Sequence, residues 1–159
     1  MNLPESFFGG AISGAVVWGL IREGLAYCFK EWSSKRKAKF KTLSEEAAAL
    51  IPLIDSVVVS SIKYYSVAGN DNYELSTSIK ASVKQIADRY SGLSRRLVEM
   101  NNPALNSFVI IRFRQSVTLD LDSKHRKAWD LSNVGLNNIL DSATNLREEL
   151  HDTKFNVAR

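Results

Sequence analysis

The feature of this sequence that most restricts its fold is an apolar stretch over residues 7–29. Its charge-free first part, residues 7–21, is followed by Arg22 and Glu23 and then by further apolar residues. A helix needs about 20 apolar residues to cross the hydrocarbon core of a bilayer. Residues 7–21 are too few, whereas the whole stretch gives roughly 34 Å of helix at ~1.5 Å per residue. We therefore predict a single-pass transmembrane helix that makes residues 1–29 an N-terminal membrane anchor.

Two charged residues interrupt this stretch near its C-terminal end. The long aliphatic stem of Arg22 allows its guanidinium to reach the lipid headgroups. Three interpretations of Glu23 are open: its carboxylate lies in the membrane interface, it pairs with a neighbouring chain, or it marks the true end of the span. Charged groups inside a span are costly and point to function by default.

Positive charge is concentrated directly behind the anchor. Residues 1–41 carry seven basic side chains against three acidic ones, while the rest of the chain is balanced, so this short segment accounts for the whole net charge of +4. A balanced folded domain argues against nucleic acid as a partner. The basic residues predicted to lie at the membrane interface are Arg22, Lys30, Lys35, Arg36, Lys37, Lys39 and Lys41.

The flanks of the span also predict its orientation. Because lysine and arginine favour the cytoplasmic side, residues 30–159 are expected in the cytoplasm and the N-terminus outside. Tyr27, Phe29 and Trp32 suit an aromatic belt at the inner headgroups. Residues 30–41 are predicted to be a basic juxtamembrane linker, helical and continuous with the anchor, whose charges fix the topology and contact anionic lipid.

The anchor also carries a pattern of small residues at intervals of four: Gly10 and Gly14, with Ala11, Ala15 and Gly19 alongside. Small residues let two helices approach closely in lipid, so this face predicts self-association. The competing interpretation is that glycine is simply frequent in membrane helices.

Three other interpretations of the N-terminus compete with a membrane anchor. A cleaved signal peptide lacks its basic n-region and small-residue cleavage site here. A lipoprotein signal ending at Cys28 is disfavoured because the bulky Tyr27 precedes the cysteine. The strongest rival is a buried apolar helix of a soluble protein, because residues 7–21 alone are a borderline length for a span.

Residues 42–151 are predicted to form an all-α domain, an antiparallel helical bundle or elongated coiled coil of about four helices. Thr42 and Glu45 fit a capping box that would open the first helix, and Pro52 would kink or restart it. A turn follows at residues 69–72. The second helix has a heptad-like apolar seam at intervals of three and four: Leu75, Ile79, Val83, Ile86, Tyr90, Leu93, Leu97 and Met100.

The second half of the domain is less clearly patterned. The second helix should end at the Asn-Asn-Pro sequence of residues 101–103. Residues 104–121 fit a helix or an alternating strand, and we favour a helix because a lone strand would have no partner. A last helix is predicted from about Trp129 to about His151, with residues 152–159 as a frayed tail.

No residue pattern in the chain predicts catalysis. Nucleophile, phosphate-loop, zinc and dinucleotide motifs are all missing, so we expect no enzymatic activity, no cofactor and no small-molecule substrate. The densest group of potential ligands is Asp120, Asp122, His125 and Asp130. Its spacing fits no calcium loop and basic residues lie among the acids, so a solvated loop is favoured over a metal site.

Three functions compete on this basis. The favoured one is a non-enzymatic, membrane-anchored interaction or scaffold module that binds membrane lipid and either itself or a partner protein. The second is a membrane-active effector that permeabilises the bilayer through oligomers of the glycine-rich helix. The third is a soluble helical bundle with a buried apolar N-terminal helix.

Overall fold

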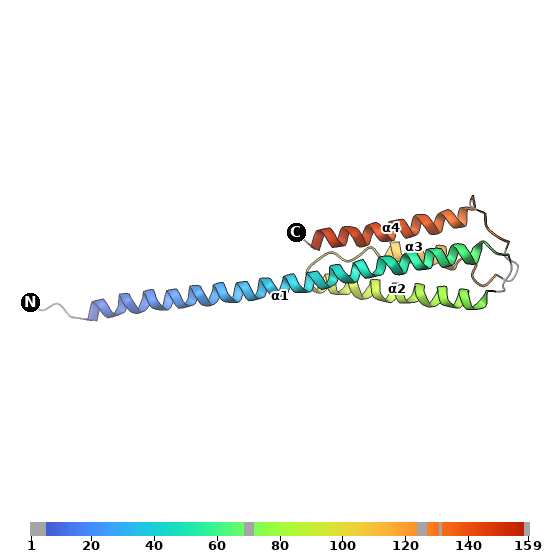
Figure 1. The fold of residues 1–159 in the computed structure, drawn as a ribbon. Helices are drawn as coiled ribbons and strands as arrows, with labels where there is room; N and C mark the ends of the chain where they lie inside the picture. Colours follow the sequence, from blue (N-terminus) through green and yellow to red (C-terminus); the bar gives the residue numbers. More distant parts are fainter. Residues whose placement is uncertain (1–5, 69–71, 124–126, 131, 158–159) are drawn as a thin grey trace, which may run out of the picture. The chain divides into compact units, whose positions relative to one another are not determined.

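The computed structural model describes the backbone of residues 6–68, 72–123, 127–130 and 132–157, and the side chains of these residues between 22 and 153. Within these ranges the protein is helical and contains no strand, which confirms the predicted all-α class (Figure 1). The helices are α1 (Ser6–Tyr65), α2 (Tyr73–Glu99), α3 (Ser107–Thr118) and α4 (Val134–Val157).

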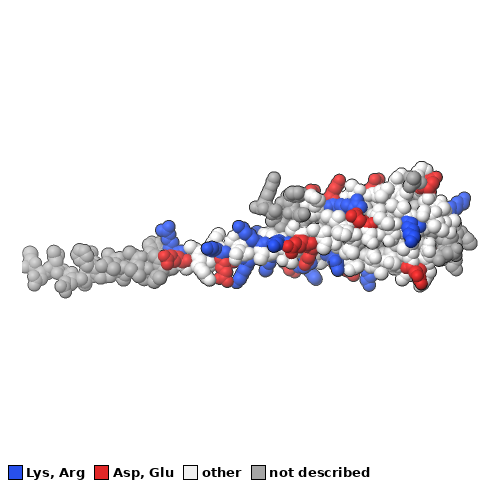
Figure 2. Space-filling view, in the orientation of Figure 1, with Lys and Arg blue, Asp and Glu red and all other residues white. Residues whose placement is uncertain are grey.

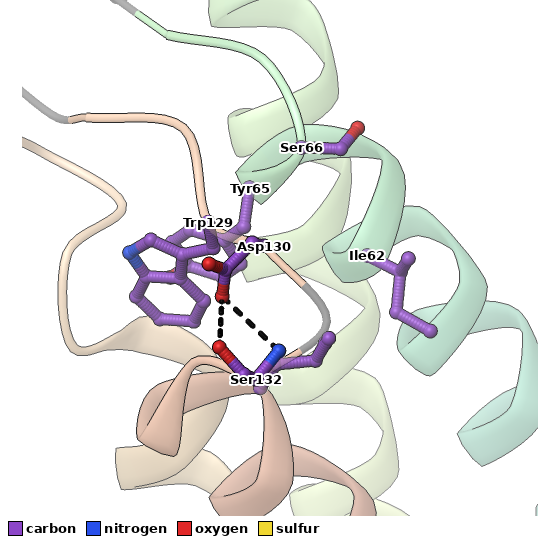
Figure 3. A pocket seen from close by; sticks show the side chains of 7 residues that line it. Ile62, Tyr65, Ser66, Trp129, Asp130 and Ser132 are labelled. Carbon is purple, nitrogen blue, oxygen red and sulfur yellow. Dashed lines mark hydrogen bonds between the residues drawn. The ribbon is translucent and has the colours of Figure 1, made fainter.

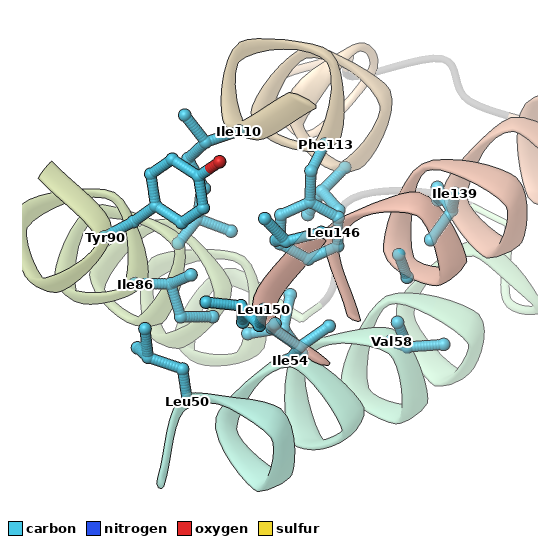
Figure 4. Packing of buried hydrophobic residues seen from close by; sticks show 14 of the residues in the cluster. Leu50, Ile54, Val58, Ile86, Tyr90, Ile110, Phe113, Ile139, Leu146 and Leu150 are labelled. Carbon is cyan, nitrogen blue, oxygen red and sulfur yellow. The ribbon is translucent and has the colours of Figure 1, made fainter. Parts of the chain in front are cut away.

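The chain divides into two compact units, residues 1–40 and residues 41–159. In the second unit, the C-terminal part of α1 joins α2, α3 and α4 around one hydrophobic cluster (Figure 4). All four helices contribute fully buried side chains, among them Leu50, Ile54, Ile86, Phe113, Ile139 and Leu146. Burial of these apolar faces supplies most of the free energy that holds the helices together.

α1 passes without a break through the two positions at which the sequence suggested an interruption. The expected helix start at Thr42 and Glu45 is wrong, because the helix already extends through residues 30–41. A capping box acts only where the preceding backbone is not helical, and this lysine-rich segment propagates a helix instead. Pro52 likewise lies inside α1, where the helix neither ends nor restarts.

α2 places its predicted seam in the bundle core. Six of the eight seam residues are buried, and the end residues Leu75 and Met100 are partly buried and pack against the same cluster. The helix ends as the Asn-Asn-Pro sequence predicts. Asn101 has a positive φ of 59°, and the amides of Asn101 and Asn102 donate to the carbonyls of Val98 and Leu97, at 2.9 Å each. This is a Schellman arrangement, in which asparagine takes the left-handed position.

The segment with ambiguous periodicity forms a helix. α3 buries Ile110, Phe113 and Val117, which are spaced by three and four residues, and not the alternate residues of a strand. Asn106 caps the helix, since its side chain accepts a hydrogen bond from the Phe108 amide at 3.1 Å. The favoured helical interpretation of residues 104–121 is therefore confirmed over Ser107–Thr118, and the residues on either side are not helical.

α4 differs from its predicted bounds at both ends. Trp129 precedes the helix instead of starting it, because Asn133 caps α4 by accepting the Gly135 amide at 2.8 Å. At the other end the helix continues past residue 152 to Val157. Leu150 is buried in the core and the Thr153 hydroxyl donates to the Glu149 carbonyl at 2.8 Å, so the predicted frayed tail begins as helix.

Candidate functional site

The basic residues of α1 that were predicted at a membrane interface are all exposed to solvent. This group, which we call the basic collar, consists of Arg22, Lys30, Lys35, Arg36, Lys37, Lys39 and Lys41. Figure 2 shows positive side chains along this part of the helix, with a few acidic ones between them. Their exposure leaves the charges accessible to an external anionic surface.

Acidic and aromatic neighbours orient part of the collar. Glu31 pairs with Lys35 at 2.7 Å, and Glu45 lies 3.9 Å from Lys41; both pairs link consecutive helical turns. The guanidinium of Arg36 lies over the Trp32 ring at 5.3 Å from the ring centre, and 5.6 Å from that of Phe40. Arginine stacked between aromatic rings keeps its charge while its planar face is covered, which suits a contact between apolar and polar surroundings.

Large apolar side chains are exposed on the same part of α1. They are Leu25, Tyr27, Phe29 and Trp32, each more than half exposed. Phe29 and Trp32 lie 6.0 Å apart between ring centres. So many neighbouring large apolar groups exposed to water are uncommon on the surface of a soluble protein.

Among residues with described side chains, α1 holds one stretch that is long and apolar enough to cross a membrane, judged by length and composition only. It lies between Arg22 and Tyr65, has a mean hydropathy of 1.5 and is 39% buried. Charges are too frequent before Ala47 to allow such a stretch there, so it occupies the part of α1 that contributes Leu50 and Ile54 to the core. That burial is the property of a core helix.

The predicted anchor itself is described only in part. Its backbone is helical from Ser6 onward, in agreement with a helix over this stretch. The side chains of residues 1–21 lie outside the described residues, and so do the small residues predicted to mediate self-association: Gly10, Ala11, Gly14, Ala15 and Gly19.

Three tyrosines of the bundle, Tyr64, Tyr65 and Tyr90, lie in its interior. The hydroxyls of Tyr64 and Tyr65 donate to the carbonyls of Leu121 and Val117, at 2.8 and 2.7 Å. Tyr90 donates to the Asn106 carbonyl at 3.0 Å. These bonds tie the ends of α3 to α1 and α2, as buried polar groups require.

The environment of Tyr90 keeps its hydroxyl protonated, so that it can donate a hydrogen bond. Burial raises the pKa of this phenol well above its ordinary value, and the negative charge of Glu149 raises it further. Tyr90 therefore stays protonated and serves as a structural link. Tyr73, in contrast, is exposed at the start of α2.

Two ion pairs connect α1 to its neighbours. Arg96 of α2 makes two contacts with the Glu46 carboxylate, one of them at 2.6 Å between Nη1 and Oε1. Arg147 of α4 pairs with Asp55 at 2.5 Å. Because all four side chains are partly exposed, these pairs set the register of the helices more than they add stability.

A cleft of about 550 Å³ opens between the end of α1 and the start of α4. Tyr65 and Trp129 stack at 3.9 Å between ring centres and 5° between ring planes, and the Trp129 amide donates to the Tyr65 carbonyl at 2.8 Å (Figure 3). Asp130 accepts the amide and hydroxyl of Ser132 at 3.0 and 2.8 Å. The hydrogen bonds at the edge of this cleft therefore stabilise the turn that leads into α4.

Two members of the possible ligand group in the third interhelical connection have other partners. Asp122 pairs with Lys80 of α2 at 2.5 Å, Asp130 is bound to Ser132, and His125 lies outside the described residues. No group of three or more metal-binding side chains occurs within the ranges that the structure describes. Asp122 and Asp130 therefore serve as structural contacts.

These features define an all-helical bundle whose first helix carries an exposed basic and aromatic segment. No protein-family model, curated protein or solved structure matches the chain. Function is therefore argued from the residues alone.

Proposed function

We propose that this protein is a non-enzymatic interaction module held on a membrane by its N-terminal helix, with the bundle on the cytoplasmic side. The observation that carries the proposal is the exposure of the basic collar together with Leu25, Tyr27, Phe29 and Trp32 on the same part of α1. An apolar helix, an aromatic belt and a row of cations in this order match the layers of a bilayer and its anionic inner surface.

The polar chemistry of the bundle supports a scaffold and not a reaction centre. The buried hydroxyls of Tyr64, Tyr65 and Tyr90 all donate to backbone carbonyls, and the Ser116 and Ser142 hydroxyls bond each other at 2.7 Å. Groups used in this way fix the helices in place. We propose that the bundle presents helical surfaces to a second copy or to a partner protein.

Cell fractionation tests the anchor. We expect the full chain to sediment with membranes and to stay there after a wash at ~1 M salt. Such a wash reduces the Debye screening length to about 3 Å and so weakens purely electrostatic binding. It should require detergent for release, because hydrophobic insertion does not depend on salt. A variant with Lys35, Arg36, Lys37 and Lys39 changed to Gln should remain membrane-bound. Recovery of the intact chain as a soluble monomer would reject the proposal.

Disulfide cross-linking tests self-association through the small residues. Cys28 is exposed and follows Gly10 by about five helical turns of ~3.6 residues, so both lie on the same side of α1. A parallel pair that packs through Gly10 and Gly14 should cross-link at Cys28. The double change Gly10→Ile and Gly14→Ile should lower the cross-linked fraction about fivefold, the equivalent of ~1 kcal/mol of helix packing.

The matched control for this experiment is Ala26→Ile. Ala26 is exposed and, two residues before Cys28, lies on the opposite side of α1. It should leave the cross-linked fraction unchanged. Equal loss in the control and the double variant would show that the small-residue face is not the contact.

A further inference from the structure

The outer face of α3 is an apolar surface without a partner among the described residues of the bundle. Phe108 and Ile111 are 65% and 49% exposed, and Leu119, the residue that follows the helix, is 68% exposed. With Gln115 they follow one line along the helix at intervals of three and four. The core-facing side of α3 is opposite: Ile110, Phe113 and Val117.

This face is also positively charged. Arg112 and Arg114 are exposed, and α3 contains no acidic residue. Neither arginine has a carboxylate partner among the described residues. Of the two acids just beyond the helix, Asp120 is half-buried and Asp122 is held by Lys80. Exposed phenylalanine, isoleucine and leucine beside free arginines form the composition that binds at the interface of an anionic membrane.

The size of the face favours lipid over a second copy of the chain. A helix of 12 residues is about 18 Å long, and a strip of ~10 Å width over it covers on the order of 180 Å². A stable protein interface buries about 800 Å² on each partner. A lipid surface sets no such minimum when the chain is already tethered to it, because tethering raises the local concentration.

We propose that the outer face of α3 is a second membrane-contact site, which docks the bundle on anionic lipid through Phe108, Ile111 and Leu119, with Arg112 and Arg114 on the headgroups. This inference rests on the proposed membrane tethering. Its occupant is the lipid surface itself, recognised by apolar insertion and phosphate charge. Docking of this kind would hold the bundle against the bilayer and leave its other faces free for partners.

A fluorophore that reports on polarity tests the site in the full chain. In a Cys28→Ser background, Phe108→Cys is labelled and the protein is reconstituted into vesicles of phosphatidylcholine, with or without phosphatidylglycerol. We expect blue-shifted emission in the anionic vesicles, quenched by lipids that carry a nitroxide. Changing Arg112 and Arg114 to Gln should lower the docked-to-undocked ratio about fivefold per charge.

The matched control carries the label at Val98, an exposed apolar residue of α2 outside this face, and should keep its water-like emission. Water-like emission at position 108 in both vesicle types would overturn the inference while the tethering stands. A blue shift that lipid quenchers do not reach and that grows with protein density would assign the face to a second copy and overturn it too. Failure of the chain to float with vesicles would overturn the tethering as well.

Discussion

Replacing Phe113 with alanine should lower the free energy of unfolding by about 3–5 kcal/mol, the usual cost of removing a buried phenylalanine ring. Phe113 is 0% exposed and belongs to the cluster that all four helices share. Its neighbours are held by other helices and cannot fully close the space that the ring leaves. Urea unfolding of the full chain in mild detergent, followed by circular dichroism, measures the change.

Phe108→Ala is the matched control for this substitution. It removes the same ring from the same helix, but on the exposed side, and should change stability by no more than about 0.5 kcal/mol. The contrast separates core packing from helix propensity, since the two substitutions are chemically identical. Similar losses in both variants would mean that α3 does not sit on the bundle with its Phe113 side inward.

Gly135→Ala should destabilise the bundle by about 1–3 kcal/mol through overpacking. A Cβ at this position would lie 2.5 and 2.8 Å from two ring carbons of Trp129. The ring cannot simply rotate away, because it stacks on Tyr65 and its own backbone amide is bonded to the Tyr65 carbonyl. The loss exceeds the ~0.5–1 kcal/mol that alanine otherwise adds to a helix. Near-ultraviolet circular dichroism should also lose the signal of the stacked pair.

Gly92→Ala, on α2, should change the stability in the opposite direction. The nearest atom to an added Cβ is the flexible guanidinium of Arg96, at 3.9 Å, which is an ordinary contact. Without a clash, the gain in helix propensity remains, and stability should rise by about 0.5–1 kcal/mol. If both glycine substitutions stabilise the protein, the close approach of Trp129 to α4 is wrong.

Local sequence was a good guide wherever one residue pattern dominated. The spacing of the α2 seam predicted a helix buried along one side, and the Asn-Asn-Pro sequence predicted its end. It was a poor guide where two signals competed. The capping-box pattern at Thr42 and the helix-forming residues before it gave opposite answers, and a continuous helix was found because propagation adds a hydrogen bond for each residue that it orders.

Contacts between residues that are distant in the sequence were the main feature that the sequence did not predict. Nothing near Gly135 in the sequence indicates that a tryptophan ring six residues earlier folds back onto Tyr65. The pairing of Glu46 with Arg96 and of Asp55 with Arg147 is equally invisible, since each partner is one of many surface charges. The exposed face of α3 could not be predicted from the sequence either. Apolar residues lie on both sides of this helix, so their spacing does not show which side is buried.

The sequence by itself determined the helical class and the placement of positive charge behind the first apolar stretch, because both depend on near neighbours along the chain. Only the tertiary structure decided which apolar residues are enclosed and which stay exposed. Phe113 and Phe108 are the same residue type on the same short helix, and they differ only in what other helices cover. Burial is a property of packing between distant segments, so it is settled when the bundle forms.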